Sequence, residues 1–111
     1  MLENTCIPAL RKKIMESMGE EIKAEALAKE FGMSLSSLRR YWKRYHGNET
    51  FMMYRNRHFL HESSRLLVET NLTIKEIAER LNFADAFYFS KKFRQLSGLS
   101  PVEYRKKYRV L

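Results

Sequence analysis

The chain has 111 residues, 44% of them hydrophobic, with a formal net charge of +8 and a sequence pI of about 9.8. This composition favours a packed core over disorder. The single cysteine, Cys6, excludes an internal disulfide. The sequence has neither a signal-peptide pattern nor an apolar run of the roughly 18 residues that span a membrane. We therefore expect a cytoplasmic protein whose partner is anionic, and on charge alone a nucleic acid and an anionic membrane both qualify.

Residues 1–19 predict a helix that covers the core of the next segment of the chain. Four apolar residues recur at helical spacing along it: Ile7, Leu10, Ile14 and Met18. Proline is tolerated only in the first turn of a helix, so Pro8 predicts a start near Ile7. Gly19 predicts the end of the helix.

Residues 20–50 predict two short helices joined by a turn. The first carries Leu27 and Ala28 as its apolar pair, and Ser34 is the expected N-cap of the second. The buried stripe expected in the second helix consists of Leu38, Trp42 and Tyr45. The side chains expected to face solvent are Ser36, Ser37, Arg39, Arg40, Lys43 and Arg44.

Residues 51–70 predict one long linker helix, because neither glycine nor proline interrupts the chain from Phe51 to Glu69. Its expected apolar stripe could pack on both flanking units and consists of Phe59, Leu60, Ser63, Leu66 and Leu67. A continuous helix here would fix the spacing and the relative rotation of those units.

Residues 71–111 predict three further helices. Thr73 and Glu76 form a capping box at the first, and Asn82 stands where a helix ends in a left-handed residue. The second helix buries Phe89, Phe93 and Leu96 and stops at Gly98. The third begins with Ser100 as N-cap, Pro101 and Glu103. A basic tail from Lys106 to Arg109 is expected to fray.

The segments 20–50 and 71–98 repeat one pattern about fifty residues apart. Leu27 and Ala28 correspond to Ile77 and Ala78, and Gly47 corresponds to Gly98. Two short helices with a tight turn between them, the second rich in exposed bases, describe a helix-turn-helix that contacts DNA. The fold predicted is all-α, with about seven helices in two helix-turn-helix units.

The second unit also resembles the DNA-binding domain of the AraC/XylS transcription regulators. The resemblance rests on motifs that run in order along the chain: Ile74, Ile77 and Ala78, then Asn82 and Phe83, then the run from Tyr88 to Arg94, then Gly98, Pro101, Tyr104 and Arg105. Two departures are Asn82 in place of the turn glycine and Phe59 in place of an arginine.

This resemblance implies a monomer that places two recognition helices in successive major grooves, about one turn or 34 Å apart. It also implies regulation of transcription, more commonly activation, and a contact with RNA polymerase. An effector-sensing or dimerisation domain is expected elsewhere in a longer chain.

The resemblance further implies which residues contact bases in the major groove. In the first recognition helix they are Ser36, Arg39 and Arg40, and in the second they are Ala86, Phe87, Ser90 and Lys91. Arginine and lysine can bond guanine, serine suits either base type, and apolar groups can touch the thymine methyl. Phe87 either meets such methyl groups or lies in the core beside Tyr88, and we favour exposure.

Phosphate contacts are expected from two basic blocks. Residues 31–60 hold six Lys or Arg against one acid, and residues 91–111 hold seven against one. The expected phosphate contacts are Ser37, Lys43, Arg44, Thr73, Lys92, Arg94, Arg105 and Lys106.

Other functions are less well supported by the sequence. His58 and His61 have no third ligand at metal spacing, Cys6 has no base partner, and no glycine-rich phosphate loop is present, so we predict no enzyme, no metal and no cofactor. The two alternatives to specific DNA binding are a non-specific, architectural or RNA-binding protein and a module that contacts RNA polymerase or another protein partner.

Overall fold

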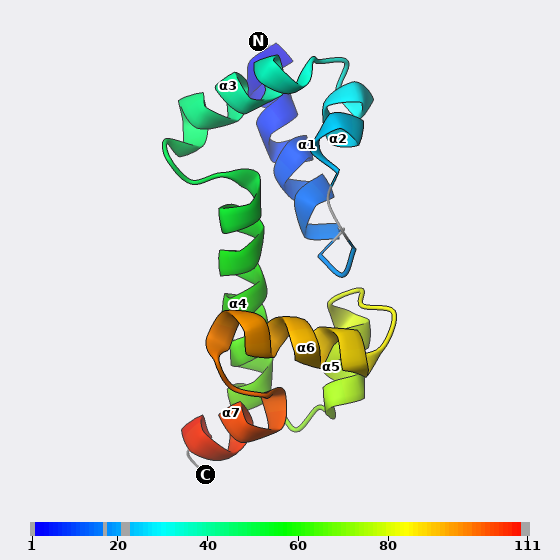
Figure 1. The fold of residues 1–111 in the computed structure, drawn as a ribbon, viewed down its shortest axis with the longest axis vertical. Coiled ribbons are helices and arrows are strands. Elements are labelled where there is room, and N and C mark those ends of the chain that lie inside the picture. The colour runs from blue at the N-terminus through cyan, green and yellow to red at the C-terminus, as the bar shows by residue number, and fades with distance from the viewer. Residues whose placement is uncertain (1, 17, 21–22, 110–111) are drawn as a thin grey trace. The chain divides into compact units, whose positions relative to one another are not determined.

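The computed structural model describes residues 2–16, 18–20 and 23–109, with side chains from Ile7 onward. In that part of the chain every regular element is a helix (Figure 1). The helices are α1 Leu2–Glu16, α2 Ala24–Glu30, α3 Leu35–His46, α4 Phe51–Glu69, α5 Ile74–Arg80, α6 Ala86–Ser97 and α7 Pro101–Tyr108. The predicted all-α fold of about seven helices is therefore confirmed.

The helices form two compact units, residues 1–55 and residues 56–111. The boundary falls inside α4, whose first residues belong to the first unit and whose remainder belongs to the second. The linker helix predicted over residues 51–70 exists as a single helix, α4, and each unit uses part of it for its core.

The core of the first unit is centred on Trp42, which is 2% exposed. Its indole Nε1 donates to the Glu49 carbonyl at 2.7 Å, so the buried polar atom of the ring is satisfied. The His46 ring stacks on it with centroids 3.8 Å apart. Other buried residues around it come from α1, α2, α3 and the start of α4: Leu10, Ile14, Leu27, Ala28, Leu38, Phe51 and Tyr54.

The core of the second unit is centred on Phe59 of α4, which is fully buried. Three phenylalanine rings lie around it at centroid distances of 5.4, 5.7 and 6.4 Å, those of Phe83, Phe89 and Phe93. Such tilted and edge-on pairs add to the stability that burial alone supplies. The phenylalanine that replaces the expected arginine thus forms the centre of an aromatic core.

Local signals place most helix ends where the sequence predicts them. Thr73 with Glu76, and Ser100 with Glu103, both form complete capping boxes. Asn82 has a φ of 64°, as the prediction of a left-handed residue requires. Gly98 ends α6 in the left-handed conformation.

The two capping boxes lead to a prediction about acid stability. Hydrogen bonds from Thr73 lower the pKa of Glu76, and those from Ser100 lower the pKa of Glu103, each from an ordinary value of 4.5. A depressed folded-state pKa gives stability that is complete above the unfolded pKa and is lost as pH falls through the folded one. We expect the free energy of unfolding, measured by urea denaturation, to decrease below about pH 4.5.

Glu76→Gln and Glu103→Gln are the matched variants, since glutamine accepts the same hydrogen bond without titrating. Their combination should flatten the acid dependence while leaving the helix content at pH 7 unchanged. An identical acid slope in wild type and double variant would contradict the prediction.

The start of α1 differs from the prediction. The helix begins at Leu2 and contains Pro8 in its interior, whereas a start near Ile7 was expected. An interior proline costs about 3 kcal/mol, because it removes one backbone hydrogen bond and crowds the preceding turn. Burial of Ile7 and Leu10 on either side, at 5% and 1% exposure, offsets that cost.

The buried stripe of α3 also differs by one residue. Leu38 and Trp42 are buried as predicted, but the third member is Tyr41 at 8% exposure, while Tyr45 is 40% exposed. Tyr45 lies in the last turn, and its ring meets that of Tyr41 edge-on at 5.4 Å. The prediction for Tyr45 was therefore wrong, because helical spacing does not show where the neighbouring helices stop covering a face.

Candidate nucleic-acid interface

The exposed face of α3 carries every residue of this helix that the sequence proposes for DNA contact. Ser34 caps the helix and its hydroxyl accepts from the Ser37 N–H at 3.1 Å. With Leu38, Tyr41 and Trp42 fixed in the core, the opposite face points to solvent. It presents Ser36, Ser37, Arg39, Arg40, Lys43 and Arg44, all exposed.

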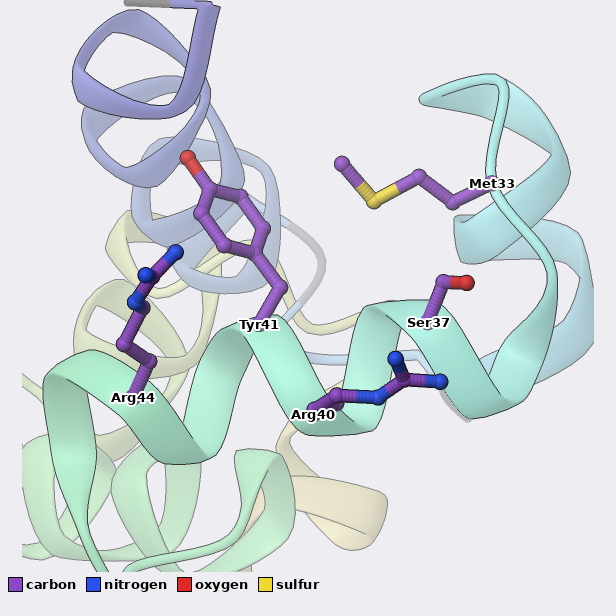
Figure 2. A pocket seen from close by; sticks show the side chains of 5 residues that line it. All are labelled: Met33, Ser37, Arg40, Tyr41 and Arg44. Atoms are coloured by element: carbon purple, nitrogen blue, oxygen red, sulfur yellow. The ribbon is translucent and has the colours of Figure 1, made fainter.

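Two hollows flank this face. The larger has a volume of about 520 Å³ and is lined by Met33, Ser37, Arg40, Tyr41 and Arg44 (Figure 2). The smaller, of about 290 Å³, lies at the turn between α3 and α4 and includes Arg39 and Lys43 together with Glu49. Arginine side chains therefore border α3 on two sides.

The start of α6 presents the second candidate surface. Asp85 caps the helix, and its Oδ1 accepts from the Tyr88 N–H at 2.7 Å. Phe87 is 79% exposed, so the expectation of an exposed rather than a buried ring is confirmed. Lys91 is exposed, and Ala86 and Ser90 are half-buried.

The residues proposed for phosphate contact in the second unit are not equivalent. Arg94 and Lys106 are exposed. The Lys92 ammonium lies 5.6 Å from the centroid of the Phe59 ring, a cation–π contact with the core. The Thr73 N–H donates to Glu76 Oε1 at 3.0 Å, so this amide is engaged within the capping box.

Arg105 is placed differently from the expectation. Its Nε donates to the Leu67 carbonyl at 2.9 Å and its Nη2 to the Thr70 carbonyl at 3.4 Å, at the end of α4. Partial burial, and then the charge of Arg109, lower the pKa of this guanidinium. Arg105 holds α7 against α4, and we remove it from the set of expected phosphate contacts.

We expect Arg105→Ala to destabilise the second unit by about 1–3 kcal/mol, because it leaves the Leu67 carbonyl without its donor. Urea denaturation followed by circular dichroism measures the change. Lys106→Ala is the matched control, since this exposed neighbour should change stability by less than about 0.5 kcal/mol. Equal stability of the two variants would contradict the structural role of Arg105.

The structure adds residues that the sequence did not single out. Arg109 does not fray: its Nη2 donates to the Thr70 carbonyl at 3.2 Å and to the Asn71 side chain. Arg55, part of the first basic block, is 1% exposed and donates to the Glu20 carbonyl. A local signal could have identified Asp85 as the N-cap of α6, because this aspartate stands three residues before Tyr88. The contacts of Arg55 and Arg109 join residues that are 35 or more positions apart, and no local signal indicates them.

The structure also bears on the sites considered for other functions. Within residues 2–16, 18–20 and 23–109 no three His, Cys, Asp or Glu side chains gather as a metal site would require. No helix in the same part of the chain has both the length and the apolar character needed to cross a membrane. The side chain of Cys6 lies outside the described residues.

Comparisons with known proteins place this geometry among helix-turn-helix proteins. A family model described as a helix-turn-helix domain matches residues 27–107. The uncharacterized HTH-type transcriptional regulator YisR of Bacillus subtilis is 49% identical over 53 residues, which cover 48% of this chain and 18% of YisR. The HTH-type transcriptional activator RhaS of Salmonella schwarzengrund is 37% identical over 90 residues, covering 81% and 32%. The chain thus spans about a third or less of these relatives.

Solved structures agree on the fold. The C-terminal domain of AraT, a response regulator from Geobacillus stearothermophilus, matches with a TM-score of 0.71 at 27% identity, over 95% of this chain and 87% of that domain. The C-terminal domain of the response regulator yesN from Fusobacterium nucleatum matches with 0.67 at 26%, over 91% and 98%. The DNA-binding domain of AdpA, solved with a target DNA, has the same fold, with a TM-score of 0.65 at 24% identity, over 91% and 90%.

Proposed function

The chain belongs to the AraC/XylS-type family of helix-turn-helix DNA-binding domains, and we propose that it binds duplex DNA sequence-specifically through α3 and α6. The family comprises transcription regulators and not enzymes. The observation that carries the proposal is the pair of capped helices, each with an aromatic core face and an exposed polar or basic face. Such a helix can enter a major groove with its exposed face against the base edges.

We propose that one molecule uses both helices, in major grooves about one turn or 34 Å apart. The support is that α4 runs unbroken from Phe51 to Glu69 through the boundary between the two units. If the DNA must bend to meet both helices, the stiffness of its sequence will add to specificity.

The residues proposed to contact bases are exposed, except for Ala86 and Ser90, which are half-buried. In α3 they are Ser36, Arg39 and Arg40, and in α6 they are Ala86, Phe87, Ser90 and Lys91. The exposed ring of Phe87 suits the thymine methyl group, and the guanidinium groups suit guanine. The residues proposed for phosphate are Ser37, Lys43, Arg44, Thr73, Lys92, Arg94 and Lys106.

Activation of transcription through a contact with RNA polymerase is part of the same proposal. Its support is the relative RhaS, which is named a transcriptional activator. Because the matched segment covers 32% of RhaS, we also propose that a domain for effector sensing or dimerisation accompanies this one in a longer chain.

A protein-contact function is the second candidate, and one observation favours it. Met52 and Met53, in the first turn of α4, are 44% and 54% exposed, and methionine is common at surfaces that bind proteins. Replacing both by glutamine should leave DNA affinity unchanged and lower transcription if this surface contacts a partner.

Selection of bound sequences from a random duplex library tests DNA specificity directly. We expect two short conserved motifs separated by about one helical turn. Absence of any enriched sequence would contradict the proposal and favour the non-specific alternative.

On the selected duplex, Arg39→Ala and Arg40→Ala should each cost about 1–3 kcal/mol and relax the preference at one base pair. Affinities measured by fluorescence anisotropy on single-base variants of the duplex identify that position. Lys12→Ala, which removes one exposed charge from α1, is the control for net charge. Equal losses on selected and random duplexes would show that the arginine contacts phosphate instead.

A further inference from the structure

Three consecutive aromatic residues at the start of α6 have very different environments. Phe89 is fully buried, and Tyr88 is 43% exposed with its ring 5.7 Å from that of Phe83. Phe87 is 79% exposed, more than any other large apolar side chain in the part of the chain that the structure describes. Contact with a partner would remove this apolar ring from water, which is favourable.

The place of Phe87 on α6 indicates what that partner is. Phe87 is the second residue of the helix, and the bond from the Tyr88 N–H to Asp85 Oδ1 at 2.7 Å fixes the first turn. Long side chains of a helix lean toward its N-terminus, and the N-terminal residues of a recognition helix contact base edges. One and two turns further along the same face, Lys91 and Arg94 are exposed and basic, which suits DNA.

The chemistry of the ring limits what it can recognise. A phenyl group has neither a hydrogen-bond donor nor an acceptor, so it cannot distinguish bases by their polar atoms. In the major groove of unmodified DNA, the apolar group on a base edge is the C5 methyl of thymine. 5-Methylcytosine carries the same methyl group on the same ring carbon. For an apolar ring, the methyl groups of these two bases are equivalent ligands.

We propose that Phe87 recognises a 5-methyl group rather than a base pair, so that 5-methylcytosine is a second ligand at the position where thymine is preferred. The inference rests on the proposed DNA binding and extends it, because methylation of cytosine at this position would strengthen binding. A polar neighbour such as Lys91 can separate thymine from cytosine. It cannot separate the methylated from the unmethylated form of either base, since their polar atoms are the same.

The test measures the effect of one methyl group in two base pairs. Each thymine of the selected duplex is replaced in turn by deoxyuridine, which lacks the methyl group, and affinity is followed by fluorescence anisotropy. We expect one position at which wild type binds about 4-fold more weakly, the effect of roughly one buried carbon group. With cytosine at that position, methylation of its C5 should strengthen binding by about the same factor. Neither effect should depend on salt, because a methyl group carries no charge.

Two variants assign these effects to a side chain. Phe87→Ala should abolish both, and it should fold, because alanine favours a helix at this exposed position. Lys91→Ala is the matched control from the same face, and it should leave both methyl effects as they are in wild type, whatever its overall affinity. A methyl group also changes the stiffness of DNA, so only the part of each effect that is lost with Phe87 reports a contact.

Three results would overturn the inference: no thymine whose methyl group matters, methyl effects that persist in Phe87→Ala, or no gain from methylation of cytosine at the same position. Lower transcription in Phe87→Ala without any methyl effect would also overturn it, by indicating a protein partner for the ring. If the proposed function itself fails, wild type will bind selected and random duplexes equally. The inference fails alone when wild type prefers its selected duplex and no methyl effect depends on Phe87.

Discussion

We expect the affinity for duplex DNA to fall about 10³–10⁵-fold when monovalent salt is raised from about 50 to about 200 mM. Each neutralised phosphate releases a condensed counterion, so roughly six to ten contacts give a steep, linear dependence of log K on log salt. We expect this salt dependence to come from the net charge of +8 and from the exposed basic side chains of α3, which include Arg39, Arg40, Lys43 and Arg44. Titrations at several salt concentrations on the selected duplex measure it.

Two variants serve as controls for this salt dependence. Lys106→Ala should lower the slope by about 0.9, because it removes one of the proposed phosphate contacts. Arg105→Ala, whose side chain is engaged with α4, should leave the slope unchanged under conditions where the domain stays folded. A slope near zero for wild type would mean that phosphate contacts do not carry the binding.

The second large effect expected is on stability: Phe59→Ala should destabilise the protein by about 3–5 kcal/mol. Small domains have total stabilities of about 5–15 kcal/mol, so this variant should be partly unfolded under mild conditions. Phe59 is fully buried, and its removal would leave a cavity between three phenylalanine rings and the α4 backbone. Urea denaturation followed by circular dichroism measures the loss.

Phe87→Ala is the matched control, since it deletes the same side chain from a position that is 79% exposed. Its stability should change by less than about 0.5 kcal/mol. Its affinity for the selected duplex should fall if the ring meets a thymine methyl group. A destabilisation comparable to that of Phe59→Ala would show that Phe87 is packed in solution.

What the sequence predicts well depends on residues close together along the chain. A capping box joins residues three apart, as Thr73 and Glu76 are, and a left-handed helix end depends on one residue, Asn82. Helical spacing likewise identifies Phe89 and Phe93 as core residues. These interactions form within a turn or two of helix, so the short-range pattern is sufficient evidence for them.

The exposed faces of α3 and α6 were predictable for the same reason. Once Leu38 and Trp42 are assigned to the core, helical geometry places Arg39, Arg40 and Lys43 on the other side. The sequence allowed two environments for Phe87, an exposed one and one in the core. The position of α6 against its neighbours buries Phe89 and leaves Phe87 exposed.

By itself, the sequence determined the helix-turn-helix repeat, the helix caps and the basic faces, because each is set by residue spacing within a helix or a turn. Only the tertiary structure decided which polar groups are used internally. Arg105 and Arg109 bond to the end of α4 across 35 or more residues, and Arg55 is buried against Glu20. A basic residue has the same signal in a sequence whether it faces DNA or holds two helices together. The difference lies in which backbone carbonyls the fold brings within its reach.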